Sequence, residues 1–135
     1  MTQVTEAFDM TVQHTGDSSA VLAVAGDVDL HTAPILRDRA LAVVEEGAAH
    51  VVLDMAQVGF VDSTGLSALI TLMQAAHGAG GSLRLAEVPD RLSRMISITG
   101  ISQLMPVHAT VADALAGQAT DGQPDRTGGR TGVPD

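Results

Sequence analysis

The chain has 135 residues and a hydrophobic content of 45%, which fits one folded domain and excludes a wholly disordered chain. Its formal net charge of −9 disfavours binding to nucleic acid or to anionic membranes, and the absence of cysteine excludes disulfides and thiolate metal sites. Because the N-terminus lacks a basic leader and no run of about 18 apolar residues occurs, we expect a cytoplasmic domain.

The first half of the chain predicts a hairpin, a helix and a central strand. Polarity alternates over residues 8–13, and a polar turn then leads to the apolar run at 20–25, a pattern typical of a hairpin that ends in a buried strand. Thr32 is placed to cap a helix with proline in its first turn, and Gly47 is expected to end that helix. The apolar run at 51–53 predicts a central strand covered on both faces.

The second half continues the alternation with shorter elements. Apolar residues at helical spacing predict a helix from about residue 63 to residue 78, and alternating polarity predicts a strand at 82–86. A third helix opens at a proline and covers 89–100, where a glycine ends it. A short strand at 105–108 and a last helix at 111–116 complete the series.

Strands that alternate with helices predict an α/β fold with a mostly parallel sheet. We expect four to five strands, including an antiparallel N-terminal hairpin, packed with about four helices. Residues 118–135 lack periodicity and are rich in glycine, proline and threonine. We therefore predict one domain at 1–117, followed by a disordered C-terminal tail at 118–135.

The segment Asp62–Leu66 lies where the central strand gives way to the second helix. Asp62 or Ser63 could cap the unpaired N–H groups of that helix, and Gly65 leaves the backbone open to a partner or a ligand. A hydroxyl at a helix N-terminus also suits a phosphate group, because the helix dipole favours an anion there. On spacing alone, an ordinary helix cap is the simpler interpretation.

Two other chemistries find little support. Asp27, Asp29 and His31 alternate before the first helix, which could suggest a metal site, but acidic residues also gather there because the helix dipole favours them. A hydrolase with Ser63 as its nucleophile would need a glycine-x-serine-x-glycine turn and a partner histidine, and the sequence indicates neither. We therefore expect no metal, no cofactor and no catalytic residue.

A long stretch of the chain, from Ser63 to Leu83, contains no charged residue. A wholly buried helix would explain this absence. One face of the expected helix, however, carries the neutral polar residues Ser67, Thr71 and Gln74. Such a face has little charge to desolvate when a protein docks on it, so the stretch is also typical of a docking helix.

Several separated motifs together resemble the STAS-domain anti-sigma factor antagonists. They occur in the order and at the spacing of that family, and the resemblance covers residues 8–117. The motifs are Gly26–Asp29, Thr32–Pro34, Val52–Asp54, Phe60–Leu66, Gly80–Leu85 and Leu92–Gly100. Asp27 stands where the family often has glutamate, a change that keeps the acidic group. The resemblance implies the STAS fold for the domain and does not extend to the predicted tail.

The resemblance also implies a bacterial regulator of stress response or sporulation that works by partner switching and is not an enzyme. The unphosphorylated form would bind an anti-sigma factor that is also a serine/threonine kinase, and so release a sigma factor. The kinase would phosphorylate Ser63, with Thr64 as a minor alternative, and a PP2C-type phosphatase would reverse the change. We expect a monomer when the protein is free. The partner-binding residues implied are Asp29, Asp62, Ser63, Thr64, Gly65 and Ser67.

Phosphorylation adds a charge of about −1.5 to −2, which a helix N-terminus tolerates. We therefore expect a phosphate on Ser63 to act on the docking surface, near Asp29 and Asp62, without unfolding the domain. An alternative within the same family is a STAS scaffold or ligand-sensing domain that is never phosphorylated.

Overall fold

The structure is a computed structural model that describes residues 8–121, with side chains for residues 8–117. Strands and helices alternate along this part of the chain. The elements are β1 (Phe8–His14), β2 (Ser19–Val28), α1 (Ala33–Glu45), β3 (His50–Val61), α2 (Ser63–Gly78), β4 (Ser82–Ala86), α3 (Asp90–Thr99), α4 (Ile101–Leu104), β5 (Val107–His108) and α5 (Val111–Asp121). Among residues 8–121, no helix combines the length and the hydropathy needed to cross a bilayer.

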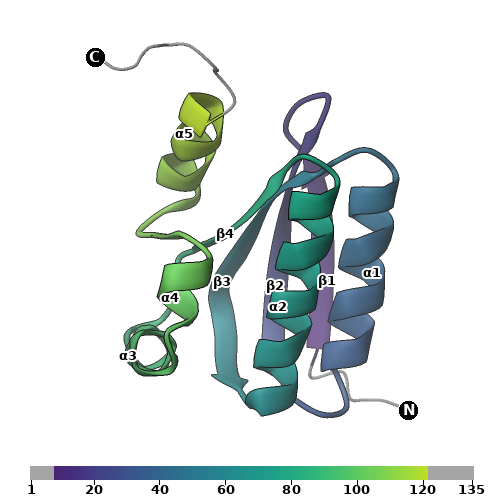
Figure 1. The fold of residues 1–135 in the computed structure, drawn as a ribbon. Helices are drawn as coiled ribbons and strands as arrows, with labels where there is room; N and C mark the ends of the chain where they lie inside the picture. Colours follow the sequence, from purple (N-terminus) through teal and green to yellow (C-terminus); the bar gives the residue numbers. More distant parts are fainter. Residues whose placement is uncertain (1–7, 122–135) are drawn as a thin grey trace.

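The five strands form one mixed sheet in the order β1-β2-β3-β4-β5 (Figure 1). β1 runs antiparallel to β2, and every other neighbouring pair is parallel. The predicted α/β fold, with its parallel sheet and antiparallel opening hairpin, is therefore confirmed. The parallel pairs place the C-terminal ends of β2 and β3 at the same edge of the sheet, where α1 and α2 begin.

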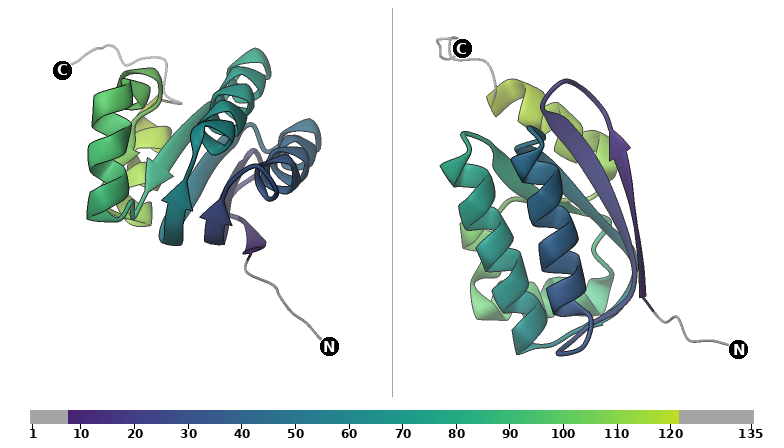
Figure 2. Two further views of the ribbon diagram at one scale, coloured as in Figure 1. Left: turned by 90° about the horizontal axis from the view of Figure 1, so that it is seen from below. Right: turned by 90° about the vertical axis from the view of Figure 1, so that its right-hand side faces the viewer.

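Helices cover the sheet unequally, as the view from below in Figure 2 shows. α1 and α2 lie on one side, over a large apolar core that includes Leu22, Leu53 and Leu69. α5 lies on the other side, over a separate small cluster made of Val21, Val52, Ala86 and Ala114. Alternation along the strands produces the two sets, because successive side chains of a strand point to opposite faces of the sheet.

The structure differs from the sequence-based expectation in its C-terminal half. We expected about four helices, but Gly100, in the left-handed conformation (φ 82°), ends α3 and is followed at once by the four-residue α4. The described residues therefore contain five helices. α5 continues to Asp121, four residues past the domain boundary predicted at 117, and residues 122–135 of the predicted tail lie outside the described residues.

Candidate functional site

The candidate site lies at the sheet edge where β2 and β3 end. Val28, the last residue of β2, pairs with Val61, the last residue of β3. The loop after Val28 leads into α1, whereas α2 begins directly after Asp62. The carboxyl ends of neighbouring parallel strands are where α/β proteins commonly place binding sites. The segment Asp62–Leu66 and the residues Asp27–His31 therefore meet at one edge.

Asp62, one of the two cap candidates in the sequence, fixes the start of α2. Its backbone is extended (φ −100°, ψ −174°), and its carboxylate accepts a hydrogen bond from the Gly65 N–H at 2.9 Å. The Asp62 N–H donates to the Val28 carbonyl at 3.1 Å, which ties the start of α2 to the end of β2. Ser63 is consequently the first residue of a helix that is anchored on both sides.

Ser63 presents its hydroxyl to solvent. The residue is exposed, and within the part of the chain whose side chains are described its hydroxyl takes part in no hydrogen bond. Thr64, the other candidate hydroxyl, is half-buried. Of the two neighbours, Ser63 is therefore the more accessible to another protein.

The outer face of α2 continues this neutral surface. Ser67, Thr71 and Gln74 are exposed at helical spacing after Ser63, whereas Leu69 and Leu72 on the opposite face are buried. α2 is therefore not wholly buried, and the charge-free stretch includes an uncharged, solvent-facing helix surface. This arrangement fits the docking interpretation of the sequence and does not fit the buried one.

Gly65 serves packing rather than access, which corrects the expectation that it leaves the backbone open to a partner. The residue is buried, and a Cβ atom built on it would lie 2.7 Å from the Val28 carbonyl oxygen and 2.8 Å from Val61 Cγ1. Glycine is needed here because α2 passes so close to the ends of β2 and β3. Gly65 holds the site in place and offers no surface to a docking protein.

Asp29 organises the loop between β2 and α1. Its carboxylate accepts hydrogen bonds from the N–H groups of His31 (2.9 Å) and Thr32 (3.1 Å) and lies 3.2 Å from the Thr32 hydroxyl. These donors, the His31 N–H first among them, lower the pKa of Asp29 because they favour its charged form. Asp29 is therefore an ionised, half-buried group at the edge of the site.

Thr32 occupies the cap position of α1 but does not cap the helix with its side chain, so that part of the prediction is wrong. Its hydroxyl donates to the Asp27 carbonyl at 2.6 Å and accepts from the Asp29 N–H at 2.9 Å. Asp29 instead satisfies the N–H groups that precede α1. The capping role passes to Asp29 because a tight turn separates β2 from α1.

The metal and hydrolase interpretations gain no support from the geometry. The carboxylate of Asp29 is engaged by the donors of its own loop, and no three metal-ligating side chains converge anywhere in the described residues. The histidine hydrogen bonds in that part of the chain join His50 to Ser82 and His108 to Arg84, and none reaches Ser63. Within the described residues, Ser63 therefore has no hydrogen-bonded base of the kind that a nucleophilic serine requires.

The sequence interpretation missed three exposed apolar side chains at this edge. Leu30 is 64% exposed in the loop after β2, Ile35 is 46% exposed in the first turn of α1, and Phe60 is 50% exposed near the end of β3. Phe60 could have been noticed, because it is one of only two phenylalanines and directly precedes the Asp62–Leu66 segment. Apolar groups beside a solvent-facing hydroxyl favour a protein-docking surface.

Comparison with known proteins identifies the family of the domain that contains the candidate site. The model of a family described as "STAS domain" matches residues 9–114, which contain the whole candidate site. An anti-sigma-B factor antagonist of Bacillus subtilis is 33% identical over 86 residues, which cover 64% of this chain and 78% of the relative.

Solved structures show the same architecture. An anti-sigma factor antagonist from Mycobacterium paratuberculosis superposes with a TM-score of 0.74 at 28% identity, covering 83% of this chain and 94% of that one. Unphosphorylated SpoIIAA, an anti-sigma factor antagonist, superposes with a TM-score of 0.70 at 17% identity, covering 87% of this chain and all of that one. The phosphorylated form of SpoIIAA, a Bacillus cell fate determinant, superposes with a TM-score of 0.63 at 17% identity. The match covers 80% of this chain and 97% of that one.

Proposed function

The chain belongs to the STAS-domain family of anti-sigma factor antagonists, and from this premise we propose that Ser63 is the phosphorylated residue of a partner switch. In this proposal the unmodified protein binds an anti-sigma factor that is also a serine/threonine kinase, and a sigma factor is thereby released. The kinase transfers phosphate from ATP to Ser63, and a PP2C-type phosphatase removes it. The protein itself is a non-enzymatic binding module.

One observation carries the proposal: Ser63 is an exposed residue at the first position of a firmly capped helix, and its hydroxyl has no hydrogen bond to any side chain or backbone group in the described residues. A kinase must bring the acceptor oxygen into its own active site, so the hydroxyl has to be accessible. A fixed helix start presents that oxygen in one position. The neighbouring Thr64 is less accessible and remains the minor alternative.

The charge of the phosphate explains how the switch would work. A phosphate adds about −1.5 to −2 charge, and the N-terminus of α2 compensates only about 0.3–1 kcal/mol of it. Asp62 and the ionised Asp29 lie at the same edge, so a docked partner would enclose like charges. Like charges placed together in an interface cost several kcal/mol. A penalty of about 3–4 kcal/mol reduces affinity a few hundredfold.

The partner surface follows from the site. Exposed Leu30 and Phe60 supply apolar contact area beside Ser63, and the uncharged face of α2 that includes Ser67 adds polar contact without a large desolvation cost. Asp29 and Asp62 flank the acceptor, Thr64 neighbours it, and Gly65 sets its position. Because the kinase uses ATP, the proposal places the switch in the cytoplasm. The structures of SpoIIAA in its unphosphorylated and phosphorylated forms support such a switch on this fold.

Two substitutions at Ser63 test the proposal. Ser63→Ala is first used to recover the ATP-binding anti-sigma factor from the native cells, and its affinity is then measured with purified proteins. We expect Ser63→Ala to bind like the unmodified protein and Ser63→Asp to bind much more weakly. Ser97→Asp is the matched control, because it adds the same charge at an exposed serine of α3, outside the proposed surface. If Ser63→Asp bound the anti-sigma factor as tightly as Ser63→Ala, the proposed switch would be wrong.

A further inference from the structure

The docking of α5 on the sheet depends on very little apolar surface. Its small cluster contains four buried residues, Val21, Val52, Ala86 and Ala114, with Val111 and Leu115 packed partly against them. All are small or medium-sized side chains. An element held by so few apolar contacts opens locally at a lower free-energy cost than elements of the main core. Polar contacts therefore matter more for α5 than for α1 or α2.

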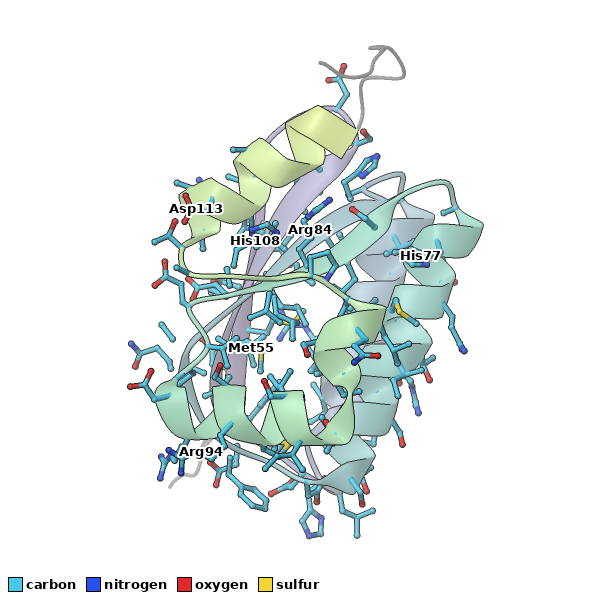
Figure 3. All side chains as sticks on the ribbon, turned by 60° about the vertical axis from the view of Figure 1, so that its left-hand side comes forward. Met55, His77, Arg84, Arg94, His108 and Asp113 are labelled. Carbon is cyan, nitrogen blue, oxygen red and sulfur yellow. The ribbon has the colours of Figure 1, made fainter. Side chains whose placement is uncertain are left out.

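Two polar contacts hold α5 and its neighbours in place. The Glu87 carboxylate, just after β4, accepts a hydrogen bond from the Val111 N–H at 3.1 Å, at the first residue of α5. Glu87 reaches it from the left-handed region (φ 59°), which few non-glycine residues adopt. The second contact joins Arg84 Nη1 on β4 to His108 Nε2 on β5 at 3.0 Å. Figure 3 shows Arg84 and His108 together between the sheet and α5.

The Arg84 contact defines the protonation state of His108. A guanidinium group has only donors, so His108 Nε2 must accept with its lone pair. The imidazole is then neutral, with its proton on Nδ1. Arg84 is only 5% exposed, and this burial lowers the pKa of Arg84, although an arginine stays charged throughout the physiological range. The pair is therefore one buried cation beside one neutral ring.

α5 closes directly over this pair. A Cβ atom built on Gly117 would lie 3.1 Å from Arg84 Nη1 and 3.1 Å from His108 Cε1. Both side chains therefore lie directly against the α5 backbone at Gly117. A new charge on His108 would be placed beneath the docked helix.

We propose that protonation of His108 releases α5 from the sheet and leaves the α1–α2 side folded. Protonation turns the Arg84–His108 hydrogen bond into a contact between two cations, which is unfavourable in a buried place. Release of α5 lets water reach both groups. The exposed sheet surface would be the one that includes Val21, Val52 and Ala86. This response is independent of Ser63.

The other charged groups around His108 are acidic but do not bind it. Asp113 belongs to α5, and the Glu87 carboxylate accepts a hydrogen bond from the Val111 N–H. Asp54 lies on β3, two strands away from His108, because both residues pair with Ala86 of β4. None of them hydrogen-bonds to His108, whose hydrogen bond in the described residues is to Arg84. Among the described residues, the charged group hydrogen-bonded to the ring is a cation, which sets the direction of the response: α5 is held at neutral pH and released as the pH falls.

Hydrogen exchange on the full chain tests this inference without a partner protein. Amide exchange is measured at about pH 7.5 and about pH 5.5, a range in which histidines change charge, and is corrected for the intrinsic rate. We expect protection of the 111–121 amides to fall about tenfold relative to those of α2 at the lower pH, a loss of about 1.4 kcal/mol in local stability. His108→Gln, which keeps an acceptor but cannot be protonated, should abolish the change. His77→Gln, an exposed site on α2, should leave the change intact.

A second measurement keeps the inference testable if His108→Gln fails to fold. Nitrogen chemical shifts of the imidazole at about pH 7.5 should show a neutral ring with its proton on Nδ1. The inference would be overturned by a proton on Nε2, by unchanged protection of α5 at the lower pH, or by an equal loss of protection in His108→Gln. None of these outcomes depends on whether Ser63 is phosphorylated.

Discussion

The two sides of the sheet place their sensitive groups in opposite surroundings. On the α2 side, Ser63 is exposed at the start of a helix that rests on the main core. On the α5 side, Arg84 and His108 lie beneath a helix whose Ala114 packs against only three buried residues of the sheet. A charge added at Ser63 meets solvent and a helix N-terminus, so it changes what can dock. A charge added at His108 meets another cation, so it changes whether a helix stays docked.

The difference shows that a charge-controlled surface needs a rigid support. The start of α2 is fixed by the Asp62 cap, by the Asp62–Val28 hydrogen bond and by the close approach of Gly65 to β2. α5 has no comparable packing. Substitutions that loosen the start of α2 therefore test whether its support is rigid. Substitutions that change the pH dependence of only one region test whether the start of α2 and α5 respond independently.

The largest expected effect on stability comes from Gly65→Ala. The added methyl group would lie 2.7 Å from the Val28 carbonyl oxygen, so α2 would have to shift. Overpacking of this kind costs about 1–3 kcal/mol of unfolding free energy. Urea denaturation measures the loss. Gly78→Ala is the control, because open space surrounds this glycine at the last position of α2 and the change should cost no stability. Equal effects of both substitutions would contradict the rigid support assigned to Gly65.

A smaller effect, on binding alone, is expected for Phe60→Ser. Phe60 is half exposed beside Ser63, and an aromatic side chain near the centre of an interface contributes about 1–2 kcal/mol, or roughly tenfold in affinity. Titration calorimetry with the purified anti-sigma factor measures it. Ile98→Ser is the matched control, because Ile98 on α3 is 79% exposed and lies outside the proposed surface. The docking surface would be misplaced if Ile98→Ser weakened binding as much as Phe60→Ser.

The smallest expected effect is on the pH dependence of stability, and it distinguishes the acid response of Asp29 from that of His108. The pKa of Asp29 is lowered by its loop donors, so the charged carboxylate stabilises the fold above the unfolded-state pKa. That contribution is lost as the pH falls through the folded-state pKa, below about pH 4. Asp29→Asn should therefore flatten the stability profile only in this acid range. Thermal melts from about pH 3 to pH 7 provide the measurement. A change between about pH 5.5 and pH 7, within the range in which the release of α5 is tested, would show that the two regions are coupled.

Local signals in the sequence predicted most of the fold and singled out the segment Asp62–Leu66 as the candidate site. Periodicity located the strands and helices, and the Asp62 cap could be predicted because donor and acceptor lie three residues apart. The roles of Gly65 and Glu87 could not be predicted in this way. Gly65 depends on a close approach to Val28, and Glu87 reaches an N–H group 24 residues away. Such contacts exist only after the sheet has assembled.

The exposure of individual side chains was equally hidden. Leu30 and Phe60 are exposed, whereas the nearby apolar residues Val28 and Val61 are buried. Residue type alone does not tell the exposed pair from the buried pair. Arg84 lies between two leucines in β4, a pattern typical of a strand with one solvent-facing side. The residue is nevertheless buried beneath α5. In each case the outcome depends on which helix covers which side of the sheet.

Intact mass spectrometry after incubation with the anti-sigma factor kinase and ATP tests the central claim most directly. The unmodified protein and Thr64→Ala should each gain one phosphate, about 80 Da, whereas Ser63→Ala should gain none. Ser67→Ala, one turn along the exposed face of α2, should be phosphorylated like the unmodified protein. Full phosphorylation of Ser63→Ala would contradict the assignment of Ser63 as the residue that controls docking.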